Sequence, residues 1–328
     1  MSIASATPDR NYSIDLVKFI AMCLVVCLHT TYDYIVPGEI NIEYILYNSA
    51  VIAVPLFFMV SGYLLIGRED ATYRYATRKI LGIIRFVFLV VVLWWLVRCI
   101  ASRSWDVDIL LYTLKGVFIQ EGPFGVFWYF GAMCILYSVY PLINRLTKIP
   151  KYFLTILILI GIMQNLAFSW SLVDIGERGI VQVLRIWNWL FYFMLGGVLK
   201  KLTMNKMFLA ILIILTGVLN FFVIRLLSPH IGSAHCEYFY GCPVVIVYAS
   251  LVFILFKEIR ISANRLTRML SSLFLPVYTL HCIIMAILVR FGVDELGGLI
   301  FYLAVLSSTI MISWLIMKIP YVNKVFRI

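Results

Sequence analysis

Residues 12–32 read YSIDLVKFIAMCLVVCLHTTY, an apolar stretch that is long enough to cross a lipid bilayer as one helix. Hydrophobic residues make up 63% of the 328 residues and charged residues only 13%, which is more apolar surface than one soluble core can bury. The sequence therefore predicts an all-α integral membrane protein. Similar stretches recur along the chain and predict ten membrane helices, at approximately residues 12–32, 43–66, 80–101, 125–144, 152–170, 183–199, 207–227, 242–256, 271–290 and 298–318.

The basic residues indicate membrane topology. The formal net charge is +11, but Lys and Arg are scattered through short segments and form no continuous face for nucleic acid. With the N-terminus inside, the cytoplasmic segments hold Arg68, Arg74, Arg78, Lys79, Arg145, Lys148, Lys151, Lys200, Lys201, Lys206, Lys257, Arg260, Arg265, Arg268, Lys318, Lys324 and Arg327. The opposite loops hold Arg103, Lys115 and Arg178 beside Asp33, Glu39, Glu43, Asp106, Asp108, Glu121, Asp174, Glu177, Glu237, Asp294 and Glu295. The positive-inside rule therefore predicts that both termini are cytoplasmic.

The chain has no internal repeat and no linker composition, so residues 1–328 are expected to form a single membrane domain. The longest outer segment contains a half-apolar run from Val107 to Ile119, which predicts an interfacial helix and a candidate lid. The seven cysteines show no metal-ligand spacing, so no metal site is expected. Cys236 and Cys242 share an outer loop, where an oxidising compartment favours a disulfide between them.

The first predicted helix carries three ionisable side chains, Asp15, Lys18 and His29. At about 100° per residue all three share one face, and Lys18 and His29 stand about 16 Å apart along the axis. Ionisable groups inside lipid are costly, so a stripe of this kind needs a partner, a cavity or a role. Either the stripe follows a path from the inner to the outer side, or Asp15 and Lys18 extend to the inner headgroups while His29 makes an interfacial hydrogen bond.

The same segment resembles the start of the acyltransferase-3 family, whose first helix carries a basic residue, ten others and then an essential His, as in Lys18-x10-His29. Further matches fall in the family's order: VPLFFMVSGYL at 54–64, Arg74-x3-Arg78, FWYF at 127–130, FYFMLGG at 191–197 and VYTLH at 277–281. The resemblance covers nearly the whole chain. It is greatest to small stand-alone members, similar to the O-acetyltransferases of enterobacterial common antigen and O-antigen.

His29 is assigned as the catalytic residue, either as general base or as a transient acyl carrier, because a neutral imidazole with a pKa near ~6.5 can take a proton from an acceptor hydroxyl. A donor site is assigned to the basic cluster and its neighbours, since arginines bind phosphates through paired donors. Positive-inside anchoring is the alternative role for these arginines. The donor-site residues are Lys18, Asp15, Ser61, Arg74, Arg78 and Arg85, with Lys79 beside them, and Arg85 is expected to need a buried partner.

Three further side chains are secondary candidates. Trp128 and Tyr129 either belong to an interfacial aromatic belt or stack against a sugar or the donor. His281, on an aromatic helix, is either a packing residue or part of the site.

The resemblance implies an O-acyltransferase, and more narrowly an O-acetyltransferase, in a bacterial cytoplasmic (inner) membrane. Its donor would be acetyl-CoA, with no permanently bound cofactor, and its acceptor a cell-envelope glycan or a lipid-linked saccharide. The alternative is a transporter or flippase, for which related halves with matching broken helices are expected. A non-catalytic sensor or assembly subunit would leave His29 dispensable. No Walker A, GxGxxG, GxSxG or HExxH motif is present, which argues against ATPases, dinucleotide enzymes, serine hydrolases and zincins.

Overall fold

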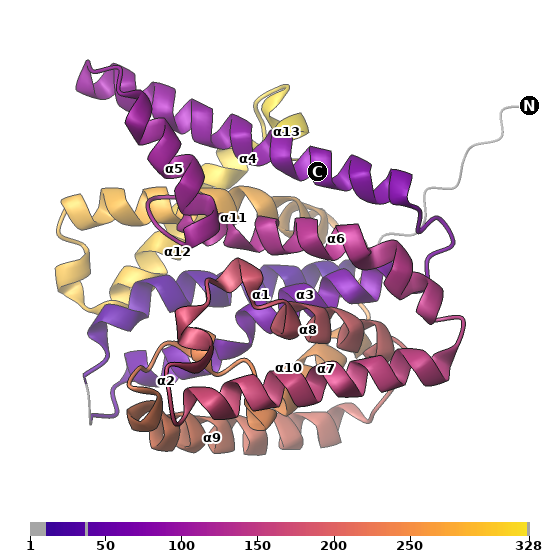
Figure 1. Ribbon diagram of the computed structural model, residues 1–328. Coiled ribbons are helices and arrows are strands. Elements are labelled where there is room, and N and C mark those ends of the chain that lie inside the picture. The colour runs from indigo at the N-terminus through magenta and orange to yellow at the C-terminus, as the bar shows by residue number, and fades with distance from the viewer. Residues whose placement is uncertain (1–10, 37–38, 327–328) are drawn as a thin grey trace, which may run out of the picture.

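The computed structural model describes residues 11–36 and 39–326, and the regular elements in these ranges are all helices. Most of the helices run along one common direction, as a membrane bundle requires (Figure 1). The α-helices are α1 (Tyr12–Thr31), α2 (Ile42–Ser49), α3 (Ala53–Leu65), α4 (Tyr73–Ser102), α5 (Val107–Ile119), α6 (Trp128–Leu146), α7 (Pro150–Ser171), α8 (Ile186–Leu199), α9 (Lys206–Ile231), α10 (Pro243–Glu258), α11 (Arg265–Arg290), α12 (Gly298–Ile316) and the short α13 (Val322–Val325).

Each of the ten predicted spans corresponds to helical structure. Eight segments of the described chain are long and apolar enough to cross a membrane, whereas α8 has only 14 residues and α10 only 16. At the helical rise these two are about 21 and 24 Å long, shorter than a hydrocarbon core of about 30 Å. Both pack among other helices, α8 against α3 and α7, and α10 against α9 and α1. Protein therefore covers much of their length.

The second predicted span is two helices, a feature that the hydropathy pattern does not predict. α2 ends at Ser49, a 3₁₀ turn covers residues 50–52, and α3 begins at Ala53. Pro55 lies just after this turn, and its missing N–H and its ring prevent a regular helix from continuing through the preceding residues. Both α2 and α3 pack against α1.

The helices form a buried centre and a lipid-facing outside. α1, α3 and α8 supply many of the fully buried side chains, including Val17, Phe58 and Trp189. α4 and α9 lie at opposite edges of the bundle (Figure 1) and expose large apolar side chains such as Phe88 and Phe222. These surfaces match lipid tails rather than water.

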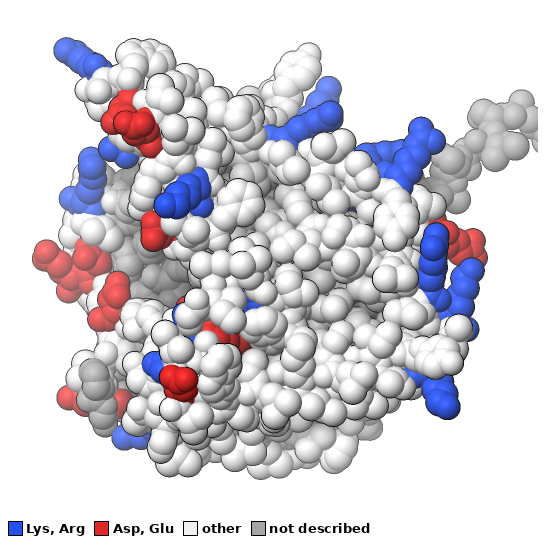
Figure 2. Space-filling view, viewed as in Figure 1, with Lys and Arg blue, Asp and Glu red and all other residues white. Residues whose placement is uncertain are grey.

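Charge divides the two ends of the bundle. The loops at one end, here called the basic end, carry mainly Lys and Arg, and the right-hand end of Figure 2 is dominated by them. The opposite end, here called the acidic end, carries most Asp and Glu together with some basic side chains (Figure 2). One of the basic residues of the chain at a helix end is Arg290, the last residue of α11. The helix order places the start of α1 and the end of α12 at the basic end.

We expect the basic end to face the cytoplasm. A reporter that is active only in the cytoplasm should be active when fused after Lys201 and inactive when fused after Glu237, because these loops lie at opposite ends of the bundle and differ in basic residues. Reporter activity in a panel of fusions measures this directly. The reverse pattern would contradict the predicted topology, and with it the prediction that the donor binds from the cytoplasmic side.

The helices α3 and α8 make the closest backbone approach in the centre. A Cβ added at Gly62 would lie 1.7 Å from the carbonyl oxygen of Phe193, and one added at Gly196 would lie 2.0 Å from the carbonyl oxygen of Met59. Small residues at the interface let two membrane helices approach this closely. Because lipid tails are as apolar as the side chains, the helices are held together by van der Waals contact rather than by the hydrophobic effect. Gly62 and Gly196 therefore hold α3 and α8 together.

We predict that Gly62→Ala and Gly196→Ala each lower the stability of the bundle by at least about 1–3 kcal/mol, because the added methyl meets backbone atoms that cannot rotate away. Thermal unfolding in detergent measures the change. Gly217→Ala on α9 is the matched control, since its Cβ would make only ordinary contact, at 3.5 Å, with the ring of Tyr248. If Gly62→Ala and Gly217→Ala unfold at the same temperature, the close contact between α3 and α8 is refuted.

The expected disulfide is wrong. All seven cysteines are free thiols, including Cys236 and Cys242. The thiol of Cys236 instead lies 3.4 Å from the carbonyl oxygen of Tyr47, and its backbone N–H donates to the Tyr47 hydroxyl at 3.1 Å. These contacts fix the 236–242 loop against α2 without a covalent link.

The helix predicted over residues 107–119 is present. α5 spans Val107–Ile119 and packs against α4 and the start of α6 at the acidic end. The indole N–H of Trp95 donates to the carbonyl oxygen of Asp106 at 2.7 Å, which ties the beginning of α5 to α4.

Candidate active site

Two cavities lie one behind the other inside the bundle. The outer cavity, of about 290 Å³, opens towards the acidic end and is lined by α1, α3, α6 and the loop around residues 235–240. The inner cavity, of about 910 Å³, opens towards the basic end and is lined by α3, α4, α6 and α11. Phe57 and Tyr129 line both cavities.

His29 lies in the last turn of α1 and lines the outer cavity. Its position is deep in the protein, yet the side chain is exposed, because it faces the cavity instead of packed atoms. Val25 and Tyr32, one turn to either side, line the same cavity, which follows from the 3.6-residue helical period. His29 is therefore accessible to a molecule that enters from the acidic end.

The mouth of the outer cavity is polar and aromatic. Tyr32 stacks on His235 with ring centroids 4.0 Å apart and an interplanar angle of 16°. The side-chain amide of Gln120 donates to the carboxylate of Glu237 at 3.2 Å, which links the end of α5 to the 235–240 loop. Asp33 adds a second carboxylate. Hydroxyl groups of a polar acceptor would find both donors and acceptors here.

His281 lies beside His29 but outside both cavities. The two rings are 5.4 Å apart, and His281 is fully buried. Its Nδ1 lies 2.8 Å from the carbonyl oxygen of Tyr278, which can only accept, so Nδ1 carries the proton. Nε2 then accepts from the thiol of Cys282 at 3.3 Å. Both ring nitrogens of His281 are thus engaged, and its ring packs beside that of His29.

Lys18 lies at the other end of the same stripe and lines the inner cavity. Its ammonium group forms an ion pair with Asp15 at 3.2 Å, and the Asp15 side chain is only 9% exposed against 27% for Lys18. The Asp15 carboxylate therefore neutralises Lys18 and holds its ammonium group in place. Lys18 and His29 therefore face different cavities along one helix.

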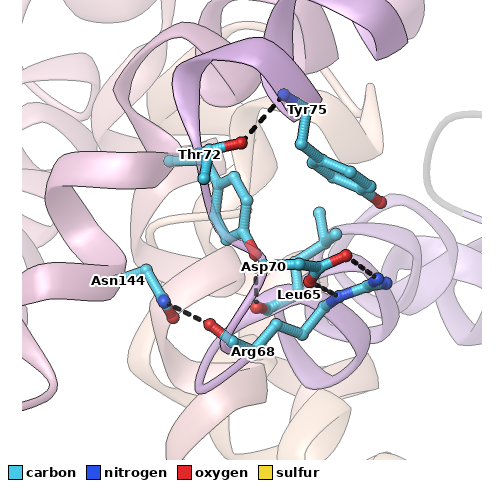
Figure 3. A network of polar contacts seen from close by, with 7 residues as sticks. Leu65, Arg68, Asp70, Thr72, Tyr75 and Asn144 are labelled. Atoms are coloured by element: carbon cyan, nitrogen blue, oxygen red, sulfur yellow. Dashed lines mark hydrogen bonds and ion pairs between the residues drawn. The ribbon is translucent and has the colours of Figure 1, made fainter.

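Two further cations line the inner cavity, Lys79 on α4 and Arg68 in the loop before it. The loop is held by α6, because Asn144 accepts from the Gly67 N–H at 2.6 Å and donates to the Arg68 carbonyl oxygen at 2.7 Å (Figure 3). The Arg68 guanidinium donates to both carboxylate oxygens of Asp70 at 2.7 Å, and this lowers the pKa of Asp70. A fork of this geometry also fits a phosphate.

The structure does not bring Arg74, Arg78 and Arg85 into the inner cavity. Their spacing of four and seven residues does place them on one side of α4, but that side is exposed, and none of the three lines either cavity. The expectation of a buried partner for Arg85 is wrong. The face of α4 that turns inward instead carries Tyr75, Lys79 and Ile83.

Ser61 and Tyr129 meet between the two cavities. The Ser61 hydroxyl donates to the carbonyl oxygen of Phe57 at 2.9 Å and lies 3.4 Å from the Tyr129 hydroxyl. Trp128 lines the outer cavity and packs on Trp189 with centroids 4.8 Å apart, at only 7% exposure. An interfacial belt needs rings that face the lipid headgroups, so the belt interpretation is wrong for Trp128.

Sequence reasoning missed several residues of both cavities. Arg68 was interpreted only as a topology signal, because the neighbouring sequence does not indicate that Asn144 holds the loop of Arg68 against the inner cavity. Glu237 was interpreted only as an outer-loop residue, His235 was not assigned to a site, and Phe57 was included only as part of the VPLFFMVSGYL match at 54–64.

Comparison with known proteins places the chain in a family. A family model described as an acyltransferase domain matches residues 11–318. An amino-acid racemase of Enterococcus faecalis is 30% identical over 159 residues, which is 47% of this chain and 22% of that protein. A serine/alanine racemase of Enterococcus gallinarum is 30% identical over 130 residues, 38% of this chain and 18% of that protein. These matches span about a fifth of each racemase. No solved structure matches the chain significantly.

The family model covers nearly the whole chain, including α1 with His29 and every helix that lines the two cavities. The matched region is all helical where it is described, and it contains the segments that can span a membrane. The chain is a multi-pass membrane protein and belongs to the acyltransferase-3 family of membrane acyltransferases.

Proposed function

We propose that this acyltransferase is an O-acetyltransferase that binds acetyl-CoA from the cytoplasm in the inner cavity. It transfers the acetyl group to a hydroxyl of a cell-envelope glycan, or of a lipid-linked saccharide, in the outer cavity. The membrane would be the cytoplasmic (inner) membrane of a bacterium. The observation that carries the proposal is the order of groups along the bundle: cations on the inner cavity, a narrow aromatic contact, then His29 on the outer cavity.

The inner cavity suits a long anionic donor. Lys18, Arg68 and Lys79 supply N–H donors near the basic end, where the phosphates of coenzyme A would bind, and the pairs of Lys18 with Asp15 and of Arg68 with Asp70 hold two of these donors in place. Its volume of about 910 Å³ is roughly three times that of the outer cavity, of about 290 Å³. The flexible pantetheine arm would carry the thioester along the distance of about 16 Å between Lys18 and His29, calculated from the helical rise. The nucleotide end then never needs to cross the membrane.

The chemistry at His29 follows from an accessible imidazole. As general base, His29 takes the proton of the acceptor hydroxyl while the oxygen attacks the thioester carbon. The carbon–sulfur bond then breaks, and the proton passes to the coenzyme A thiolate. As an acyl carrier, a ring nitrogen of His29 would attack the thioester carbon and the carbon–sulfur bond would break, releasing the coenzyme A thiolate. The acceptor hydroxyl would then attack the acyl-imidazole, the carbon–nitrogen bond would break, and the hydroxyl proton would pass to the thiolate. Either route requires His29 to meet both substrates at the contact between the cavities.

The test is acetyl transfer by purified protein. We expect protein in proteoliposomes, given acetyl-CoA labelled on the acetyl group and a saccharide fraction from the host envelope, to release coenzyme A thiol and to form base-labile labelled ester. Protein-free liposomes are the control. A transporter or flippase would leave acetyl-CoA intact, and that result would overturn the proposal.

A further inference from the structure

The two cavities meet at one aromatic contact. Among the described residues that line them, only Phe57 and Tyr129 belong to both linings, and their ring centroids are 5.7 Å apart. His29 lies on one side of this pair and Ser61 on the other. In this structure the pair therefore separates the inner cavity from the outer one.

The pair is held by its neighbours on both sides. Tyr129 packs on Phe58 at 5.0 Å and on Tyr278 at 6.1 Å, while Phe57 packs on Phe274 at 5.2 Å. Because the Ser61 hydroxyl already donates to the Phe57 carbonyl oxygen, the Tyr129 hydroxyl is the donor in their 3.4 Å contact. Aromatic packing of this kind has defined ring positions and leaves little room for a wide group to pass.

We propose that Phe57 and Tyr129 form an aromatic gate that closes the path between the cavities and selects acyl groups by their width. The inference rests on the proposed function, because the acyl group is the tip of the donor and must pass this contact to reach His29. A straight chain presents the cross-section of one methylene at each point, whereas a branch next to the carbonyl presents two carbons side by side. The gate therefore discriminates shape rather than carbon number.

The closed pair also has a second consequence, which does not depend on catalysis. A small charged reagent that enters the outer cavity should not reach Ser61, and one that enters from the basic end should not reach the outer lining. Phe57→Ala removes one of the two rings of the contact and should connect the inner cavity with the outer cavity. Accessibility therefore tests the barrier even if no acyl transfer is detected.

The first experiment compares two donors of equal carbon number, butanoyl-CoA and 2-methylpropanoyl-CoA, with acetyl-CoA as reference. The wild type should prefer the straight isomer by at least ~10-fold in kcat/KM, since misfit of one methyl group costs roughly 1–3 kcal/mol. Phe57→Ala should bring the two isomers within about threefold. Ile83→Ala is the matched control: Ile83 lines the inner cavity from α4, whereas Phe57 and Tyr129 belong to α3 and α6, so this variant enlarges the inner cavity and should keep the preference. Equal preference in the wild type and Phe57→Ala, or its loss in Ile83→Ala, overturns the selection by width.

The second experiment uses a membrane-impermeant cationic methanethiosulfonate on the full chain in sealed, oriented vesicles, with mass spectrometry to locate the modified cysteine. Ser61→Cys should be modified only from the basic end, and Val54→Cys, which lines the outer cavity, only from the acidic end. Adding Phe57→Ala to Ser61→Cys should allow modification from both ends. Modification of Ser61→Cys from the acidic end with Phe57 in place would refute the gate. Absence of transfer from every thioester, with this labelling pattern intact, would refute the proposed function alone.

Discussion

His29→Ala is expected to lower acyl transfer by about 10²–10⁴-fold while the protein still inserts and folds, because a positioned general base supplies an effect of this size. The substitution removes the one imidazole among the described side chains of α1, and that ring is exposed to the outer cavity rather than packed. The loss of packing is therefore small. Initial rates with labelled acetyl-CoA measure the change in kcat/KM, and thermal unfolding in detergent checks the fold.

The matched control is His230→Ala. His230 is exposed near the end of α9, lines neither cavity, and its Nδ1 lies 3.2 Å from the carbonyl oxygen of Leu226. Its removal should leave the rate within about twofold, as is usual for an exposed residue away from the reacting groups. Near-normal transfer by His29→Ala would exclude His29 as base and as acyl carrier, and would assign the catalytic role to another group of the protein.

Lys79→Gln and Arg68→Gln are each expected to raise the KM for acetyl-CoA by about tenfold, and the double variant by more. Hydrogen bonds to charged groups contribute roughly 1.5–3 kcal/mol, and about 1.4 kcal/mol corresponds to one factor of ten. Both side chains line the inner cavity. A smaller fall in kcat is expected, because phosphate contacts bind the ground state and the transition state alike. Steady-state kinetics over a range of acetyl-CoA concentrations separates the two parameters.

Arg85→Gln is the control on the same helix. The sequence analysis assigns Arg74, Arg78 and Arg85 to the donor, Arg85 because of its spacing on the same helix face, whereas all three side chains are exposed on α4 outside the cavity. We therefore expect Arg85→Gln to change the KM by less than about twofold. A large rise for Arg85→Gln with no rise for Lys79→Gln would move the phosphate site to the exposed side of α4 and would contradict the inner cavity as donor site.

The helices could be predicted from the sequence, because an apolar stretch of sufficient length has few options other than a membrane helix. The stripe on α1 was also predictable, since Lys18 and His29 belong to one helix of fixed period. The break before Pro55 was overlooked because hydropathy averages over a window. The predicted span 183–199 begins a few residues before α8 (Ile186–Leu199), whereas the predicted span 242–256 agrees closely with α10 (Pro243–Glu258). That helices this short are sheltered by α3, α7 and α9 is a tertiary property, which hydropathy does not reveal.

The site could be predicted only where local geometry decides it. Which side of α4 turns inward depends on its packing against α6, so the direction of Arg85 and Lys79 does not follow from their spacing. His281 lies beside His29 because α11 packs against α1, a contact between segments some 250 residues apart that the resemblance alone does not reveal. The pairing of Cys236 with Tyr47 is likewise a contact between distant segments.

The central claim is that the acyl group crosses the membrane while coenzyme A does not. The measurement uses sealed inside-out vesicles from cells that carry the gene, with acetyl-labelled acetyl-CoA added to the exposed cytoplasmic face. The account predicts labelled ester on lumenal saccharide and free coenzyme A thiol outside, with both signals lost in His29→Ala. Intact acetyl-CoA in the lumen, or labelled ester that forms equally in His29→Ala, would contradict it.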